Sequence, residues 1–421
     1  MYKEFGIDDR IITLAKNTQE EIKDKFSDIE DIREYNQLKV IKAMQDNGLS
    51  DTHFSQTTGY GYSDRGREIL DSLYASVFKA EKGLVRSQIV SGTHALSLVL
   101  FGILRPSDEL LSITGKPYDT MEEVIGIRGK GMGSLKEFGI IYRQVDLEND
   151  GTCNIEKIKQ CINQNTKMVM IQRSRGYDTR NSLSIDYIEH IIKEIRKVSK
   201  DVVIFVDNCY GEFVEKKEPI EVGADIIAGS LIKNPGGGLA PTGGYIVGRE
   251  DLVKKVSYRL TAPGIGDEIG ATLGGNRLMF QGLFMAPHVV SEALKGAVFT
   301  SRIMQKLGYE TWPRFDEKRS DIIQAIKFNN KEELIAFCQG IQKGSPVDSF
   351  AVPMPWDMPG YEHQVIMAAG TFIQGASIEL SADAPIKEPY IAFMQGGLVF
   401  EHVKLGVMIA LSDILETKEE F

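Results

Sequence analysis

The sequence predicts an α/β protein: a mostly parallel sheet of seven strands with helices on both faces, followed by a smaller α+β domain. Two observations carry this prediction. Between residues 84 and 248, short apolar runs of strand length alternate with amphipathic stretches at helical spacing. The chain of 421 residues is also too long for one ordinary core, which predicts two domains with a boundary near residue 310.

The helices and strands are expected in a regular order. Residues 1–50 form an N-terminal helical segment, and a polar, aromatic loop separates it from a helix over residues 65–81. The large domain, residues 51–310, takes its strands from the runs "VRSQIV", "ELLSIT", "GIIYRQV", "KMVMIQ", "VVIFVD", "DIIAGS" and "GYIVG". Its helices come from "THALSLVLFGIL", "NIEKIKQCI", "SIDYIEHIIKEIRKV" and a long stretch over residues 276–307. The small domain, residues 311–421, is built from "DIIQAIKF", "KEELIAFCQGIQ", "GTFIQGASIEL", "YIAFMQGG" and "HVKLGVMIALSDIL".

Composition and charge exclude several classes of protein. Acidic residues outnumber basic ones by 59 to 49, so the chain lacks the positive charge that draws proteins to nucleic acid. No apolar run approaches the length of a membrane span and the charged N-terminus is no secretory signal, so we expect a cytoplasmic protein with no membrane partner. The four cysteines and six histidines lack metal-like or paired spacing, which predicts neither a metal site nor a disulfide framework.

Lys233 is the first candidate for chemistry. It follows the apolar run "ADIIAGS" and precedes the glycines of "GSLIKNPGGG". A side chain in this place tends to point into the protein, where burial and nearby cations lower the pKa of an ammonium and leave an amine that can attack a carbonyl. A loop lysine that merely follows a strand is the alternative, and the local sequence does not decide between them.

Asp207 is the second candidate, since it ends the apolar run "VVIFVD" 26 residues before Lys233. A buried carboxylate needs a cationic partner, and the protonated pyridine nitrogen of pyridoxal phosphate (PLP) is one. The alternative is an aspartate that caps a turn. Cys209, two residues further on, either lines a pocket or packs as a small apolar residue.

The stretch "QIVSGTHALSLVL" supplies a strand, a turn of small residues and the start of a helix. The backbone amides of Gly92, Thr93 and His94, with the hydroxyls of Ser91 and Thr93, face whatever lies at that helix N-terminus, where a phosphate is favoured. An ordinary helix cap is the alternative.

The chain resembles the fold-type-I PLP enzymes, the aspartate aminotransferase superfamily, in the order of three features: a phosphate-binding turn, an acid at a strand end and a lysine after the next strand. The resemblance covers the chain from about residue 50 to the end. The stretches "GSLIKNPGGG", "DNCYGEF", "SGTHA" and "TGKPYDTMEEVIG" are similar to one branch, the methionine gamma-lyase-like, aluminium-resistance group related to the cystathionine lyases of Cys/Met metabolism. An aspartate aminotransferase-like fold and PLP as cofactor are what the resemblance implies.

The resemblance also implies roles for single residues. Lys233 binds PLP as a Schiff base and shuttles protons, and Asp207 pairs with the pyridine nitrogen. Ser230 contacts the phosphate together with Gly92 and Thr93.

Aromatic side chains have implied roles too. Tyr118 in "GKPYDT" stacks on the cofactor, with His94 as its rival and an exposed turn tyrosine as the alternative. In related lyases a tyrosine and an arginine from a loop like "TTGYGYSDRGRE" reach the phosphate of a neighbouring chain. Tyr62 and Arg65 are the candidates here, although their spacing differs by one residue, and Tyr60 is a candidate substrate contact. A solvated helix cap at Ser63 and Asp64 is the alternative.

The chain departs from its relatives at the substrate carboxylate. Those lyases bind it with an arginine of the C-terminal domain, but no arginine follows Arg319 here. The nearest candidates are Arg173, Arg175 and Arg180 in "IQRSRGYDTR", because this loop follows a strand and a guanidinium binds carboxylates with two hydrogen bonds. A solvated or interface patch of arginines remains the alternative.

From the resemblance we expect a PLP-dependent carbon–sulfur lyase that acts on a cystathionine, methionine or cysteine type of amino acid, in a homodimer or homotetramer with shared active sites. A PLP-dependent aminotransferase or amino-acid synthase on the same fold is the alternative. A third possibility, of another class, is a non-catalytic regulatory protein that keeps the scaffold.

Overall fold

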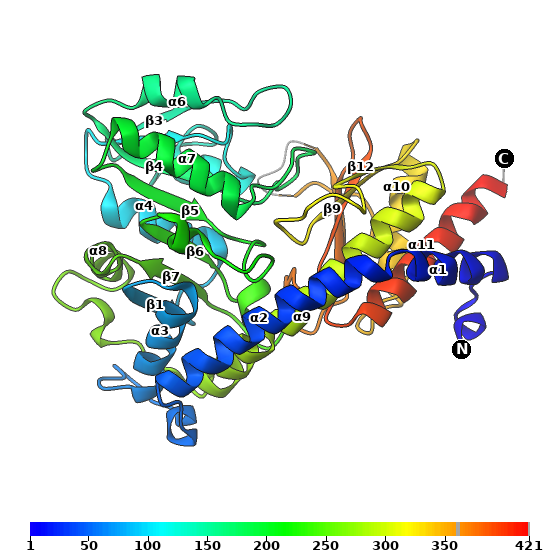
Figure 1. The fold of residues 1–421 in the computed structure, drawn as a ribbon, viewed down its shortest axis with the longest axis horizontal. Helices are drawn as coiled ribbons and strands as arrows, with labels where there is room; N and C mark the ends of the chain where they lie inside the picture. Colours follow the sequence, from blue (N-terminus) through cyan, green and yellow to red (C-terminus); the bar gives the residue numbers. More distant parts are fainter. Residues whose placement is uncertain (359–362, 420–421) are drawn as a thin grey trace.

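A computed structural model describes residues 1–358 and 363–419, and Figure 1 shows two sheets side by side along the longest axis of the molecule. Seven strands form the larger sheet in the order β1-β7-β6-β5-β4-β2-β3. β7 runs antiparallel to its neighbours β1 and β6, and the remaining pairs are parallel. The strands are β1 (Lys82–Arg86), β2 (Glu109–Ser112), β3 (Ile141–Gln144), β4 (Thr166–Gln172), β5 (Val203–Asp207), β6 (Ile226–Ser230) and β7 (Gly244–Gly248).

Helices cover both faces of this sheet because its strands are apolar on both sides. Along β4, Val169 and Ile171 belong to one core cluster, while Met168 and Met170 belong to another on the opposite face. The first face packs against α3 (Arg65–Phe78), α6 (Ile155–Cys161), α7 (Ile185–Val198) and α9 (Asn276–Lys306), and the second against α4 (Gly92–Ile103), α5 (Asp119–Ile125) and α8 (Glu250–Leu260).

The smaller sheet is antiparallel throughout, with the strand order β10-β11-β12-β9-β8. Its strands are β8 (Glu310–Trp312), β9 (Gln324–Lys327), β10 (Val365–Ala368), β11 (Ser381–Pro385) and β12 (Ile391–Gln395). A separate apolar cluster joins this sheet to α1 (Asp9–Glu21), α10 (Lys331–Lys343), α11 (Phe400–Glu419) and the C-terminal part of α9.

Two long helices connect the halves of the molecule. α2 (Lys23–Asp46) lies alongside α9, and in Figure 1 the pair runs from beneath the larger sheet toward the smaller one. Short 3-10 helices are Tyr2–Phe5, Asp51–Phe54, Pro219–Val222, Asn234–Gly236 and Gly266–Glu268. Within the described residues, no helix is both long enough and apolar enough to cross a membrane.

This architecture confirms the predicted fold class, a mostly parallel seven-stranded sheet followed by a smaller α+β part. Two segments were misplaced. The run "VRSQIV" is a strand only up to Arg86 and then turns toward α4, and "GTFIQGASIEL" forms no regular element before β11 begins at Ser381. The domain boundary near residue 310 stays a prediction.

Candidate active site

The last residues of β4, β5 and β6 lie at the carboxyl edge of the parallel strands. Asp207 is the last residue of β5 and pairs in register with Gln172, the last residue of β4. β6 ends at Ser230, and Lys233 follows it by three residues. Ligands of open α/β sheets bind at this edge, so the fold brings these side chains to a plausible place for chemistry.

Lys233 faces the first turn of α4. A Cβ built on Gly92 would lie 4.0 Å from Lys233 Nζ, 3.5 Å from Cys209 Sγ and 3.4 Å from Ser230 Cβ. Since Gly92 has no side chain, the space between these three groups is left open. Lys233 Nζ also lies 4.0 Å from the centre of the Tyr210 ring, in the range of a cation–π contact.

The charges of Asp207 and Lys233 shift each other's pKa values. Burial raises the pKa of Asp207, opposed by the charge of Lys233 and by a hydrogen bond from the Cys209 amide (3.1 Å). Burial lowers the pKa of Lys233, but its neighbours Cys209, Tyr210, Asp207 and Glu212 outweigh this effect and raise the pKa above its ordinary value. The expectation of a lowered lysine pKa is therefore wrong for the chain by itself, because the acidic groups that surround Lys233 favour its cationic form.

Sequence reasoning gave no role to Tyr210 and Glu212, although both belong to the motif "DNCYGEF". Tyr210 has a φ of 70°, a left-handed conformation that is uncommon for an aromatic residue and that accompanies the placement of its ring beside Lys233. Glu212 is fully buried, and burial raises its pKa to about 8. Its Oε1 accepts a hydrogen bond from the Tyr245 hydroxyl (2.7 Å), while no donor among the described residues reaches Oε2.

The turn before α4 combines a helix cap with free amide groups. Ser91 is the N-cap, and its Oγ accepts a hydrogen bond from the His94 amide (3.1 Å). The amides of Gly92 and Thr93 belong to the first turn, where backbone N–H groups have no partner within the helix. The Thr93 hydroxyl bonds that of Thr120 (2.8 Å), and His94 Nδ1 accepts a hydrogen bond from the Val90 amide (3.2 Å). The cap interpretation of Ser91 is confirmed, and the turn remains suited to an anion.

Tyr118 lies at the same edge, beside the loop that follows β4. Its amide donates to Gln172 Oε1 (2.9 Å), and a Cβ built on Gly176 would lie 3.3 Å from its ring. Tyr118, Gln172 and Arg175 are among the residues that line a pocket of about 270 Å³. The stacking of Tyr118 on a cofactor stays a prediction.

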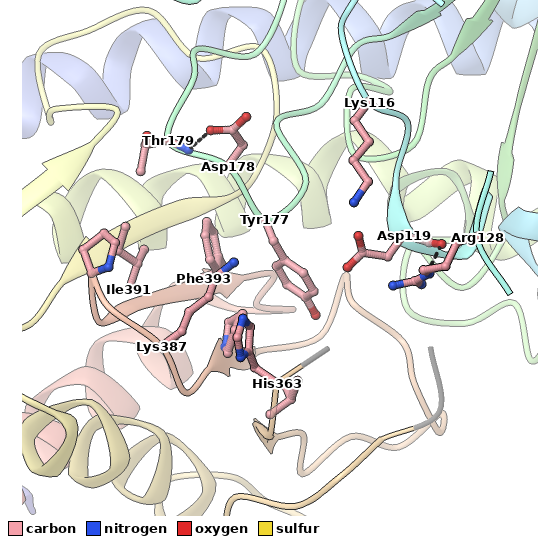
Figure 2. Close-up of a pocket in the computed structure, with 13 residues that line it drawn as sticks. Lys116, Asp119, Arg128, Tyr177, Asp178, Thr179, His363, Lys387, Ile391 and Phe393 are labelled. Atoms are coloured by element: carbon pink, nitrogen blue, oxygen red, sulfur yellow. Dashed lines mark hydrogen bonds between the residues drawn. The ribbon is translucent and has the colours of Figure 1, made fainter. Parts of the chain in front are cut away.

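A second pocket of about 310 Å³ continues from the first, because Lys116, Asp119, Tyr177 and Asp178 line both. Figure 2 shows this second pocket between Lys116 and Tyr177 on loops of the larger sheet, Asp119 at the start of α5, and Phe393 on strand β12 of the smaller sheet. The Tyr177 hydroxyl donates to Asp383 Oδ2 of β11 (3.2 Å), which ties the two sheets together beside the site.

The three candidate arginines have different surroundings. Arg173 is fully buried and its guanidinium contacts Asn208 (2.8 Å), Glu215 (3.2 Å) and Glu218 (3.4 Å), so it is held inside the fold and a substrate contact is not favoured by this geometry. Arg180 donates to the backbone carbonyls of Gln172 and Ser174. Arg175 is buried as well, but no acceptor among the described residues bonds its guanidinium.

The loop before α3 lies at the surface of the chain. Tyr60 and Tyr62 are 71% and 65% exposed, with ring centres 5.7 Å apart, and Arg65 is exposed at the start of α3. Asp64 caps this helix by accepting a hydrogen bond from the Arg67 amide (2.9 Å). The predicted contact of this loop with a neighbouring chain stays a prediction.

Comparisons with known proteins show the family to which the chain belongs. The family model for methionine gamma-lyase matches residues 11–415. The uncharacterized protein YnbB of Bacillus subtilis is 54% identical over 403 residues, which are 96% of each chain. The structure of a carbon-sulfur lyase involved in aluminum resistance from Clostridium novyi NT is 56% identical, with a TM-score of 0.94 and 97% of each chain covered. The pyridoxal-5'-phosphate dependent protein YhfS from Escherichia coli shares the fold at 16% identity, with a TM-score of 0.62 over 91% of this chain and 97% of that chain. The chain belongs to the methionine gamma-lyase family.

Proposed function

We propose that this chain is a PLP-dependent carbon–sulfur lyase that eliminates a thiol from a sulfur amino acid. The observation that carries the proposal is the meeting of Lys233, Asp207 and the glycine turn of α4 at one buried edge of the sheet. The reaction class is supported by the similarity to the carbon-sulfur lyase from Clostridium novyi. The substrate class we propose is cystathionine, methionine or cysteine.

The residues of the site fit PLP by shape and by charge. The space at Gly92, bounded by Ser230, Cys209 and Lys233, is one that a single Cβ would fill, so the glycine leaves room for a group beside the helix N-terminus. The amides of the first turn of α4 suit a phosphate dianion. The amine of Lys233 suits an aldehyde, and the carboxylate of Asp207 suits a protonated pyridine nitrogen.

When bound, PLP supplies an electron sink for the negative charge that develops at the Cα atom of an attached amino acid. Lys233 would hold the cofactor through its amine, and a free Nζ at this place would accept a proton from the Cα atom of the substrate. Asp207 would stabilise the positive charge of the pyridine nitrogen, and Tyr118 would cover the ring.

We further propose that the protein works as a homodimer or homotetramer with shared sites. The loop before α3 presents Tyr60, Tyr62 and Arg65 to solvent, where a second chain can receive them. A guanidinium from this loop would complement the phosphate dianion at a neighbouring α4 turn.

Product analysis tests the reaction. The PLP-loaded protein is incubated separately with L-cystathionine, L-methionine and L-cysteine, and the keto acid, thiol and ammonia are measured. A lyase releases keto acid and ammonia in equal amounts without an added amino acceptor, and Lys233→Ala releases neither. Keto acid that forms only when a second keto acid is supplied would indicate an aminotransferase instead. Purified protein that takes up no PLP would indicate a non-catalytic role.

A further inference from the structure

Arg175 is a buried cation whose hydrogen-bond donors are unused. Its side chain is 1% exposed, and among the described residues no acceptor bonds its Nε, Nη1 or Nη2. A guanidinium has five N–H donors, and leaving them unsatisfied in the interior is costly. Arg173, two residues earlier, is equally buried, but its Nη1 and Nη2 bond Asn208, Glu215 and Glu218, and only its Nε has no acceptor among the described residues. The contrast singles out Arg175 as a site for an anion rather than as a support of the fold.

Arg175 shares its buried surroundings with one carboxylate and a second arginine. Its nearest carboxylate is Asp321, whose Oδ2 lies 3.6 Å from Arg175 Nε. This carboxylate already accepts hydrogen bonds from the Ser174 hydroxyl (3.2 Å) and from the amides of Arg175 (3.1 Å) and Ile323 (3.2 Å). Arg319 is a second buried cation nearby. Burial and the charge of Arg175 lower its pKa to about 9, against the opposing charges of Asp321 and Glu317.

A further neighbouring pair, Arg180 and Asp178, adds no net charge. Glu317 is exposed, so Arg175 and Arg319 share one buried carboxylate, Asp321, which leaves room for one more negative charge in the buried part of this cluster.

The position of Arg175 fits the reacting centre. It lies three residues beyond Gln172, whose register partner at the end of β5 is Asp207. Together with Tyr118 and Gln172 it lines the pocket of about 270 Å³ at the carboxyl edge of the sheet. The phosphate-binding turn at Gly92 belongs to a different element, α4, so an anion at Arg175 is a separate group from a phosphate held at that turn.

We infer that Arg175 is the receptor for the α-carboxylate of the amino-acid substrate. The inference deepens the proposed function and rests on it for the identity of the anion. The planar fork of the guanidinium binds both oxygens of a carboxylate, and the carboxylate supplies the missing negative charge. Because the guanidinium nitrogens are shielded from solvent, the carboxylate reaches them by a shift of the side chains that cover the pocket.

Calorimetric binding of an unreactive probe tests the inference. The probe is 4-(methylthio)butanoate, which carries the carboxylate but no amino group, and the PLP-loaded protein is titrated with it and with the neutral amide of the same acid. We expect the wild-type protein to bind the acid at least about 10-fold more tightly than the amide. Arg175→Gln is expected to lose this preference, and Arg175→Lys to keep part of it because the charge remains without the fork.

The matched control is Arg249→Gln, at the opposite edge of the sheet, where β7 ends; it should bind the acid like the wild type. Equal binding of the acid by wild type and Arg175→Gln, or no preference for the acid in the wild type, would overturn the inference.

Melting temperatures of the variants are an independent measurement. A receptor whose donors are unused predicts an unchanged or raised melting temperature for Arg175→Gln and Arg175→Lys, whereas a marked fall in both would show a structural role and also overturn it. Because the probe cannot react, this result stands apart from the product analysis that tests the lyase reaction.

Discussion

Glu212 is predicted to make the stability of this protein depend on pH in an unusual direction. Burial raises the pKa of its carboxyl from the ordinary value of 4.5 to about 8 in the folded chain. Between these two values the unfolded chain loses the proton while the folded chain keeps it, so the free energy of unfolding falls as pH rises. The contribution is constant below the unfolded pKa, where both states are protonated, and the loss is complete above the folded pKa.

The size of the effect follows from the shift. One pKa unit corresponds to about 1.4 kcal/mol, so between pH 5 and pH 7 this group alone lowers the free energy of unfolding by up to about 2.7 kcal/mol. Glu212→Gln removes the titration but keeps the shape and an oxygen that can accept the hydrogen bond from Tyr245. As pH rises over the same range, the free energy of unfolding of the variant should therefore increase relative to that of the wild type by about this amount.

Urea unfolding of the cofactor-free proteins at the two pH values measures the difference. Comparing wild type and variant at each pH cancels the titration of groups that do not interact with Glu212, and Glu68→Gln on the exposed face of α3 is the matched control. A stability difference between wild type and Glu212→Gln that is the same at pH 5 and pH 7 would show that Glu212 is not held neutral by burial.

Three further outcomes are expected. Gly92→Ala should leave the melting temperature unchanged, since the new Cβ meets only ordinary contacts of 3.4 to 4.0 Å, but it should weaken PLP binding in a fluorescence titration by about 10-fold or more, which is about 1.4 kcal/mol. Gly275→Ala, with its nearest contact at 3.4 Å, is the control, and equal PLP affinities of wild type and Gly92→Ala would contradict the placement of the cofactor. Asp207→Asn should keep much of the PLP absorbance yet lose several orders of magnitude in turnover, and normal turnover would rule out the pairing with the pyridine nitrogen. Inactive Arg65→Ala and Lys233→Ala chains, unfolded together and reassembled, should recover about a quarter of wild-type activity if sites are shared in a dimer, because half of the random dimers hold one intact site; no recovery would argue against sharing.

Much of the fold was predictable because the buried strands of a parallel sheet are short continuous apolar runs. The runs that end at Asp207 and Ser230 match β5 and β6, and the small residues after "VSG" mark the start of α4. β1 was misplaced because "VRSQIV" looks like a strand by composition, whereas the backbone turns after Arg86 to reach α4. Strand propensity alone does not determine such a boundary, since tertiary packing decides at which residue the hydrogen bonds to the neighbouring strand end.

The candidate site was predictable only in part. Lys233, Asp207 and Gly92 carry distinctive local sequences, and the sheet brings them to one edge as expected. The pKa of Lys233 could not be deduced, because it depends on neighbours such as Cys209, Tyr210 and Asp207 that the fold alone places beside it. Arg175 could not be separated from Arg173 by sequence either, since the difference lies in which acceptors surround each guanidinium.

The central claim is that the amine of Lys233 is the group that binds the cofactor. Borohydride reduction of the PLP-loaded protein, followed by proteolysis and mass spectrometry, tests it most directly. The account predicts a single pyridoxyl-modified peptide that contains "SLIKNPGGG", with the modification on Lys233 and none on the Lys233→Ala protein. A modification on a different lysine, or none on the wild type, would contradict it.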